Sequence, residues 1–169
     1  PSADLSLRVE WEPHLSGVCI ITARGGSKRI PRKNLKPFLG RPILEYSLKA
    51  ALESRLFETV MVSTEDQEIA ELAVQLGAEV PFLRSTSAAD DSATTASVLQ
   101  EVFISYGKLN RHYEVACCCY PTAVFITPEK LRSARELLES SPDNLVVMPV
   151  APFPAPAQRA LTLNDGRLS

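Results

Sequence analysis

Short apolar runs alternate along this chain with segments in which apolar residues recur at helical spacing, and this alternation constrains the fold most. Strands alternating with helices form right-handed βαβ units around a parallel sheet. The sequence therefore predicts an α/β fold with a mainly parallel sheet and helices on both faces. Strands are predicted at 17–23, 59–63, 78–83, 115–120 and 144–150, and helices at 42–52, from a Thr64–Gln67 capping box to Leu76, at 94–106 and at 127–140.

A basic loop follows the first predicted strand directly. Residues 23–34 read A-R-G-G-S-K-R-I-P-R-K-N, and no Asp or Glu occurs from Pro13 to Leu44. The chain as a whole carries a formal charge of -2. Loops after the carboxyl ends of parallel strands form the ligand crevice of such sheets. Concentrated positive charge at this place indicates a small polyanion rather than a nucleic acid, which needs a broader basic surface.

The two glycines of this loop, Gly25 and Gly26, allow backbone N–H groups to approach phosphate oxygens. The loop lacks the G-x-x-x-x-G-K-[ST] and G-x-G-x-x-G patterns of well-known phosphate-binding turns. The alternative interpretation is a solvated basic loop that happens to follow a strand.

Length and composition predict one domain over 17–169, with residues 1–16 as a leader outside the core. No apolar run is long enough to cross a bilayer, and no signal-peptide pattern opens the chain. The chain starts without Met and stops just after an Asn164-Asp165-Gly166 turn signal, which predicts a returning strand. We therefore expect a fragment that ends within an extended arm.

Three of the four cysteines, Cys117 to Cys119, are adjacent in one apolar run, and Cys19 lies in the first predicted strand. Consecutive strand residues point to opposite faces, so the triplet suits neither a disulfide framework nor a metal-ligand spacing. The spacing predicts buried, reduced thiols in a cytoplasmic protein.

Five segments, in order, resemble the CMP-sugar-acid cytidylyltransferases (the family of CMP-N-acetylneuraminic acid synthetase), most of all the pseudaminic acid branch. The resemblance covers 17–169. The segments are I-I-T-A-R-G-G-S-K-R-I-P-R-K-N-L-K-P-F-L-G-R-P-I-L-E-Y-S at 20–47, V-S-T-E-D-Q-E-I-A at 62–70, G-A-E-V-P-F-L-R at 77–84, C-C-Y-P-T-A at 118–123 and F-P-A-P-A-Q-R-A-L at 153–161.

The resemblance implies a Rossmann-like nucleotide-diphospho-sugar transferase fold and an enzyme that couples CTP to an acidic nine-carbon sugar, a nonulosonic acid. The anomeric hydroxyl attacks the α-phosphorus, pyrophosphate leaves, and a CMP-sugar forms with the help of Mg²⁺. It also implies a cytoplasmic homodimer that binds neither nucleic acid nor membrane. The family's D-x-D-type metal carboxylates lie beyond Ser169, so no metal ligand is expected within this chain.

Matching positions imply the nucleotide-site residues. Arg24 and Lys33 are the expected catalytic residues, because they face charge that develops on the departing pyrophosphate. Arg84 has the alternative of a surface ion pair with the acidic loop that follows it, and Thr95 that of a helix cap. The implied nucleotide-binding set is Arg24, Gly25, Ser27, Lys33, Asn34, Arg84 and Thr95.

Four residues are implied for the sugar side: Tyr120, Thr122, Gln158 and Arg159. Arg159 would pair with the sugar carboxylate from an arm that reaches the other subunit, or is simply a solvated cation. Asp66 lies in the first turn of a helix, where dipole compensation explains it without catalysis. Lys28, Arg29 and Arg32 are less specific cations that raise the local potential.

Two departures from the family pattern lie near the expected site: Thr22 and Val124 stand where Pro is usual. Sialic-acid members typically carry Gln at the position of Tyr120, so Tyr120 favours pseudaminic acid. A CMP-sialic or CMP-legionaminic acid synthetase remains an alternative. A catalytically incompetent nucleotide-binding remnant is the other alternative, since the expected metal ligands are absent from the sequence.

Overall fold

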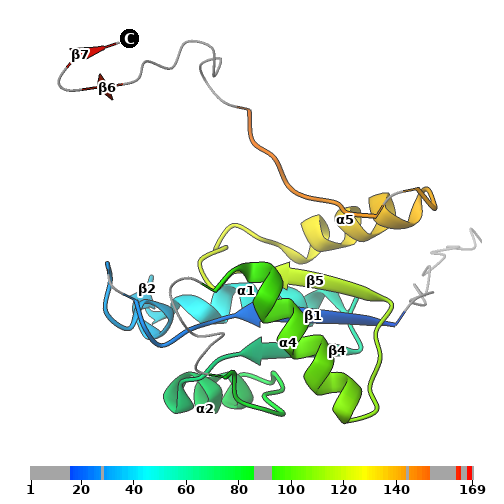
Figure 1. Cartoon of the computed structure of the whole chain (residues 1–169), viewed down its shortest axis with the longest axis horizontal. Helices are drawn as coiled ribbons and strands as arrows, with labels where there is room; N and C mark the ends of the chain where they lie inside the picture. Colours follow the sequence, from blue (N-terminus) through cyan, green and yellow to red (C-terminus); the bar gives the residue numbers. More distant parts are fainter. Residues whose placement is uncertain are drawn as a thin grey trace, which may run out of the picture. The chain divides into compact units, whose positions relative to one another are not determined.

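The computed structural model describes residues 16–27, 29–85, 93–143, 145–152, 163–164 and 167–168. Its centre is a parallel sheet in the order β4-β1-β5 (Figure 1). The strands are β1 (Gly17–Thr22), β4 (Thr59–Ser63) and β5 (Val115–Cys119). β1 is central and pairs Val18 with Thr59 on one side and Gly17 with Val115 on the other. The predicted parallel sheet is confirmed.

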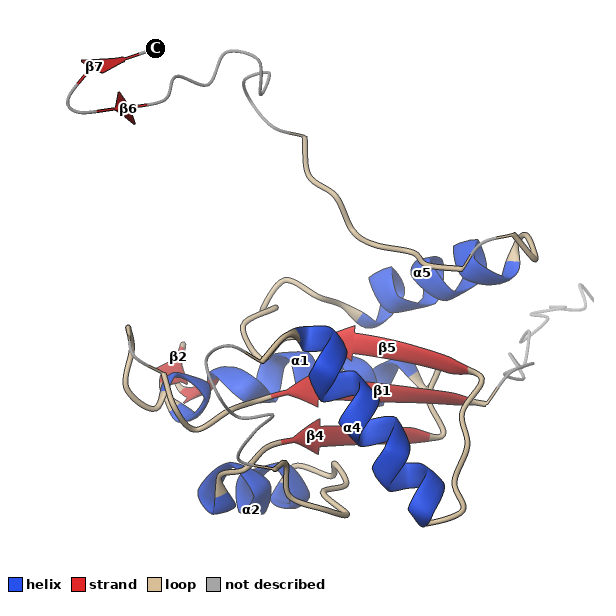
Figure 2. Ribbon diagram, in the orientation of Figure 1, coloured by secondary structure: helices blue, strands red, loops and turns tan. Residues whose placement is uncertain are grey.

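Helices cover both faces of the sheet, as the alternation predicts (Figure 2). Alternate residues of β1 enter two separate clusters. Cys19 and Ile21 pack in a cluster with residues of α1 (Ile43–Ser54) and α2 (Gln67–Gln75). Val18 and Ile20 pack instead with Val102 and Tyr106 of α4 (Thr95–Lys108). A strand that is buried on both faces, with alternate residues packing against helices on opposite sides, is typical of a three-layer α/β fold.

The helix starts differ in part from the prediction. α2 is capped by Asp66, whose carboxylate accepts from the Ile69 N–H at 3.1 Å. The predicted capping box at Thr64 is therefore wrong, because Thr64 Oγ1 accepts from the Asp66 N–H instead. The cap at Thr127 is confirmed, since its hydroxyl accepts from the Lys130 N–H at the start of α5 (Pro128–Glu139). Pro42 occupies the N-cap of α1 rather than its first turn.

Two predicted strands are not found as such. The segment 78–83 is reduced to one parallel bridge between Met61 and Glu79. The strand predicted at 144–150 is wrong over its described part, because residues 145–150 have no regular secondary structure. Leu145 and Val150 are 86% and 91% exposed. Apolar β-formers make a strand only when a neighbouring strand supplies hydrogen bonds, and the described residues offer this segment none.

The chain divides into two compact units, 1–133 and 134–169. Within the second unit, β6 (Leu163–Asn164) pairs antiparallel with β7 (Arg167–Leu168), which confirms the returning strand. The predicted leader, 1–16, lies outside the described residues except for Ser16, and the predicted domain boundaries stay predictions. None of the helices in the described part of the chain is long and apolar enough to cross a bilayer.

Candidate functional site

A cavity of about 270 Å³ lies where β1 and β5 end, at the carboxyl edge of the parallel sheet. Eight of the residues implied by the resemblance line it together, although they come from four separate stretches of chain. The structure adds four that were not assigned a binding role: Ala93, Val98, Pro121 and Thr22, the last of which was expected only to lie near the site. The eight are Arg24, Ser27, Lys33, Asn34, Arg84, Thr95, Tyr120 and Thr122.

Asn34 fixes the shape of the basic loop. It is buried, and its side-chain Nδ2 donates to the Arg24 carbonyl oxygen at 2.7 Å. It lies in a 3₁₀ turn, η1 (Lys33–Leu35), which Arg32 enters with a left-handed φ of 54°. A short hairpin of β2 (Pro37–Phe38) and β3 (Arg41–Pro42) then leads into α1. The Asn34 amide thus ties the start of the loop to its end, which places Arg24 and Lys33 on the same cavity.

The charge of the cavity lining is entirely positive. It contains Arg24, Lys33 and Arg84, and none of the described lining residues is an Asp or Glu. Arg84 is 8% exposed and donates from Nε to Ser63 Oγ at 3.1 Å and from its guanidinium to the Ser63 carbonyl. Burial lowers the pKa of Arg84, and the nearby charge of Arg24 lowers it further, against the opposing effect of Glu65 and Glu101. Arg84 is therefore not at the surface, as the alternative had it, and the acidic loop at 86–92 lies outside the described residues.

Two hydroxyl groups from segments far from the basic loop in the sequence meet in the cavity lining. Thr95 Oγ1 and Tyr120 OH lie 2.8 Å apart in a hydrogen bond that either group can donate. The interpretation of Thr95 as a helix cap is wrong, because Thr94 caps α4 by accepting from the Ser97 N–H at 3.1 Å. Thr95 is therefore available to shape the cavity with Tyr120.

The remaining cations of the basic loop are placed differently. Arg32 forms ion pairs with Asp66 and Glu68, outside the cavity lining. Burial raises the pKa of Asp66, but hydrogen bonds from Arg32 and the Ile69 N–H outweigh it and hold the pKa below its usual value. The structural interpretation of Asp66 is confirmed, since it caps α2. Arg29 is exposed, and Lys28 lies outside the described residues.

Gly25 packs closely against the turn that follows β4. Its N–H donates to Glu65 Oε1 at 2.7 Å. A Cβ atom at Gly25 would lie 2.3 Å from Asp66 Oδ2, whereas one at Gly26 would meet nothing within 4 Å. Gly25 is not among the cavity-lining residues, and its nucleotide contact stays a prediction. Gln158 and Arg159 lie outside the described residues.

The donor set of this cavity does not by itself fit a divalent metal. Mg²⁺ in nucleotide sites is held by one or two carboxylates together with phosphate oxygens. The described lining offers hydroxyls, one carboxamide and three cations. No metal-dependent step is therefore derived from these residues.

An α/β protein with a cation-lined cavity at the carboxyl edge of its sheet belongs, by class, with proteins that bind phosphorylated ligands. A family model described as Cytidylyltransferase matches residues 18–158. The chain belongs to the cytidylyltransferase family. Membership follows from a match over most of the chain, and the cavity lies within the matched range.

Named relatives are similar over most of the chain. It is 39% identical over 151 residues to pseudaminic acid cytidylyltransferase of Campylobacter jejuni, covering 89% of this chain and 65% of that protein. It is 33% identical over 139 residues to CMP-N,N'-diacetyllegionaminic acid synthase of Legionella pneumophila, covering 82% and 60%. The chain thus spans about two thirds or less of these relatives' length.

Solved structures support the fold. CMP:2-keto-3-deoxy-manno-octonic acid synthetase complexed with CTP superimposes with a TM-score of 0.62 at 23% identity, over 76% of this chain and 49% of that one. A cytidylyltransferase from Leptospira borgpetersenii gives 0.58 at 21% identity, over 77% and 51%. The predicted α/β nucleotidyltransferase fold is confirmed.

Proposed function

We propose that this chain carries the nucleotide site of an enzyme that transfers CMP from CTP to a nonulosonic acid, with pseudaminic acid as the acceptor. One observation carries the proposal: the cavity gathers three cations and no carboxylate among its described lining residues. Like charges that lie close together repel each other, and one of the three, Arg84, is buried, so a polyanion would stabilise such a lining. Family membership and the named relatives identify CTP as the polyanion that best fits.

In the proposed reaction the anomeric oxygen of the sugar attacks the α-phosphorus of CTP, and the bond to the pyrophosphate oxygen breaks. Negative charge grows on the departing pyrophosphate. Arg24 and Lys33 lie on one cavity and are the groups we assign to that charge. Ser27 donates its hydroxyl to a phosphate oxygen, and Asn34 keeps Arg24 in place through the Arg24 carbonyl.

Arg84 has a different part in this proposal. Its guanidinium is anchored by the side chain and the carbonyl of Ser63, at the end of β4. An anchored guanidinium pays little conformational entropy when an anion arrives. We assign Arg84 to the nucleotide phosphates, as a positive charge held in place by Ser63.

We assign the acceptor side to Tyr120 and Thr122, which follow β5, and to Gln158 and Arg159 further along the chain. Tyr120 is 53% exposed and its hydroxyl is held by Thr95. A hydroxyl pair can exchange hydrogen bonds with a polyhydroxylated sugar. An Arg159 guanidinium would bind the sugar carboxylate in a bidentate manner.

The full-length protein is further proposed to be a Mg²⁺-dependent cytoplasmic homodimer that acts on neither nucleic acid nor membrane. When bound, Mg²⁺ would neutralise part of the negative charge of the triphosphate. We assign its oxygen ligands to the part of the full-length protein beyond Ser169, since none of the described lining residues is a carboxylate. The formal charge of -2 and the local basic loop agree with a small-molecule substrate.

The test is pyrophosphate release by the full-length protein with CTP and Mg²⁺, with pseudaminic, legionaminic and sialic acids as separate acceptors. We expect turnover with CTP and the highest kcat/KM for pseudaminic acid. Preference for a legionaminic or sialic acid would keep the reaction and replace the acceptor. CTP binding without pyrophosphate release from any acceptor would favour a non-catalytic nucleotide-binding protein and contradict the proposal.

A further inference from the structure

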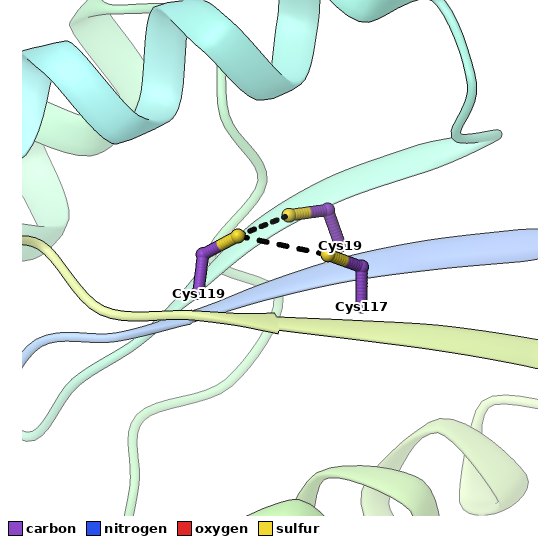
Figure 3. A group of neighbouring side chains, drawn as sticks. All are labelled: Cys19, Cys117 and Cys119. Atoms are coloured by element: carbon purple, nitrogen blue, oxygen red, sulfur yellow. Dashed lines mark hydrogen bonds between the residues drawn. The ribbon is translucent and has the colours of Figure 1, made fainter. Parts of the chain in front are cut away.

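Three cysteine side chains from two neighbouring strands meet on one face of the sheet (Figure 3). The strand register pairs Cys19 of β1 directly with Cys117 of β5, and Cys119 follows two residues later on the same face. Sγ of Cys119 lies 3.9 Å from Sγ of Cys19 and 3.6 Å from Sγ of Cys117. All three sulfur atoms lie within 4.8 Å of one another. Cys118, between the two, pairs with Ile20 and so belongs to the other face.

The cluster lies in a largely apolar environment. Cys19 and Cys119 are buried in the core cluster that includes Leu44 and Leu48 of α1. Cys117 is only half-buried, which leaves an approach from outside. All three are free thiols. No His, Asp or Glu among the described residues belongs to the group, so the chemistry of this place is that of three sulfur atoms alone.

The spacing of the sulfur atoms suits one central ion. Three bonds of about 2.3 Å from one ion, at angles from pyramidal to planar (roughly 95–120°), put neighbouring sulfur atoms roughly 3.4–4.0 Å apart. The Cys119 separations of 3.9 and 3.6 Å fall within that range, and the third pair lies within 4.8 Å. Thiolates select soft, thiophilic ions. Zinc in structural sites takes four ligands, and this group offers three, so the geometry favours an ion that is satisfied by three sulfur atoms.

Charge decides which ion fits. Burying net charge in an apolar core is costly. Three thiolates around a monovalent or divalent ion keep a net negative charge, whereas three thiolates around a trivalent ion are neutral. We propose that Cys19, Cys117 and Cys119 form a three-thiolate binding site for a trivalent thiophilic ion of the arsenite type.

The binding step balances without an oxidant or reductant. Arsenous acid, As(OH)₃, exchanges its three As–O bonds for three As–S bonds. Each thiol proton leaves with a hydroxide group, so that three water molecules are released and arsenic stays trivalent. The half-buried Cys117 is the first sulfur to react, and Cys119 and Cys19 complete the site from within the core.

Occupancy would link the two strands that carry the candidate functional site. Cys119 immediately precedes Tyr120, and β1 runs from Cys19 to the loop that holds Arg24. A ligand that binds only the folded chain stabilises it by mass action. The ion would therefore raise the melting temperature by fixing β1 against β5 below the cavity.

The experiment uses this chain reduced with a phosphine, incubated with sodium arsenite, and measured by native mass spectrometry and thermal melting. We expect one arsenic per chain with loss of three hydrogens, and a melting temperature raised by about 5 °C. Cys118→Ala is the matched control, because it removes a neighbouring cysteine from the other face. It is expected to bind arsenic as the unaltered chain does.

Cys117→Ala, the least buried member, is expected to lose the three-hydrogen adduct and the thermal shift while keeping the far-ultraviolet circular dichroism of the fold. Cys19→Ala and Cys119→Ala extend the test wherever they fold. Three results would each overturn the proposal. These are the absence of an arsenic adduct on the unaltered chain, a three-hydrogen adduct that persists in Cys117→Ala, and a Cys118→Ala variant that loses arsenic binding as completely as Cys117→Ala does.

Discussion

Arg32 and Lys33 are neighbours in one basic loop, yet the structure places them in opposite electrostatic surroundings. Arg32 lies between the carboxylates of Asp66 and Glu68 at the start of α2. Lys33 lines a cavity with Arg24 and Arg84, and no described residue of that lining is acidic. Arg32 thus helps to hold α2 against the loop, whereas Lys33 contributes to a local concentration of positive charge that suits an anion.

Counting the cations of the loop therefore overestimates how many of them line the cavity. Whether a cation of the loop belongs to the cavity depends on where the fold directs its side chain, which the sequence of the loop alone does not give. Asp66, the N-cap residue of α2, forms an ion pair with Arg32, which does not line the cavity. The hydrogen bond from Asn34 to the Arg24 carbonyl holds Arg24 near Lys33. The following predictions test this division of the loop.

The largest effect is expected for Arg24→Ala and Lys33→Ala in the full-length protein. Each variant removes a charge proposed to face the departing pyrophosphate, so kcat for pyrophosphate release should fall about 100-fold or more. Arg32→Ala is the matched control and should change kcat less than about threefold, because Arg32 is already paired. An equal fall in kcat for Arg24→Ala and Arg32→Ala would show that Arg24 has no more direct part in the reaction than Arg32.

Gly25→Ala is expected to lower the free energy of unfolding by about 1–3 kcal/mol, because the new methyl group would overlap Asp66. Gly26→Ala meets no atom within 4 Å and should be nearly neutral. Urea denaturation of both variants measures the difference. Comparable stabilities would mean that the loop does not pack on the cap of α2 as described.

Arg84→Lys keeps the positive charge but loses the fork that holds Ser63. We expect CTP affinity, measured by calorimetry, to fall about 10- to 100-fold, since one charge-assisted hydrogen bond contributes roughly 1.5–3 kcal/mol. Arg111→Lys serves as the control, because Arg111 bonds Glu79 and does not line the cavity. CTP affinity unchanged in Arg84→Lys would place the nucleotide away from this guanidinium.

Tyr120→Phe should have a smaller effect, because the tyrosine is half exposed and water can replace its bond to Thr95. We expect KM for the acceptor sugar to rise about two- to fivefold, with KM for CTP nearly unchanged. Thr95→Ser retains a hydroxyl and should stay close to the unaltered enzyme. A change in KM for CTP alone would move Tyr120 to the nucleotide side.

Asp66→Asn should have the smallest effect, because asparagine also caps helices and only the charge is lost. The pKa of Asp66 is held below its ordinary value of 3.8, so its carboxylate stabilises the fold above that pH. The stabilisation is lost as pH falls through the lower, folded-state pKa. We expect the variant to be about 0.5 kcal/mol less stable at pH 7 and to approach the unaltered chain near pH 2.

Glu53→Gln, on an exposed position of α1, is the control for a general effect of removing a carboxylate and should show no such trend. Urea denaturation at several pH values compares the three chains. If the difference in free energy of unfolding between Asp66→Asn and the unaltered chain grew toward low pH, the ionised Asp66 carboxylate would not be the stabilising form.

The sequence predicted the central strands because β1 and β4 are buried, continuous apolar runs bounded by turns. The resemblance to a known family supplied eight residues that line the cavity, and sheet topology alone predicted only that their loops meet at one edge of the sheet. Local patterns failed where the outcome depended on partners. The run at 145–150 has strand composition but no described neighbour, and a carboxylate at Asp66 replaced the hydroxyl of Thr64 as the helix cap.

The cysteines show the same limit. Spacing along one strand argued against a metal site, because Cys117, Cys118 and Cys119 alternate between faces. The third sulfur of the cluster comes instead from Cys19, about a hundred residues earlier, through the parallel register of β1 with β5. The pairing of β1 with β5 brings the three sulfur atoms together. The residue pattern of a single strand cannot reveal such a pairing.

A crystal structure of this chain with CTP would test the proposed nucleotide site directly. We expect phosphate oxygens within hydrogen-bond distance of Arg24, Lys33 and Arg84, with Arg32 still paired to Asp66. A triphosphate bound elsewhere, or one that draws Arg32 away from Asp66 while Arg24 and Lys33 make no contact, would show that the nucleotide site is not this cavity.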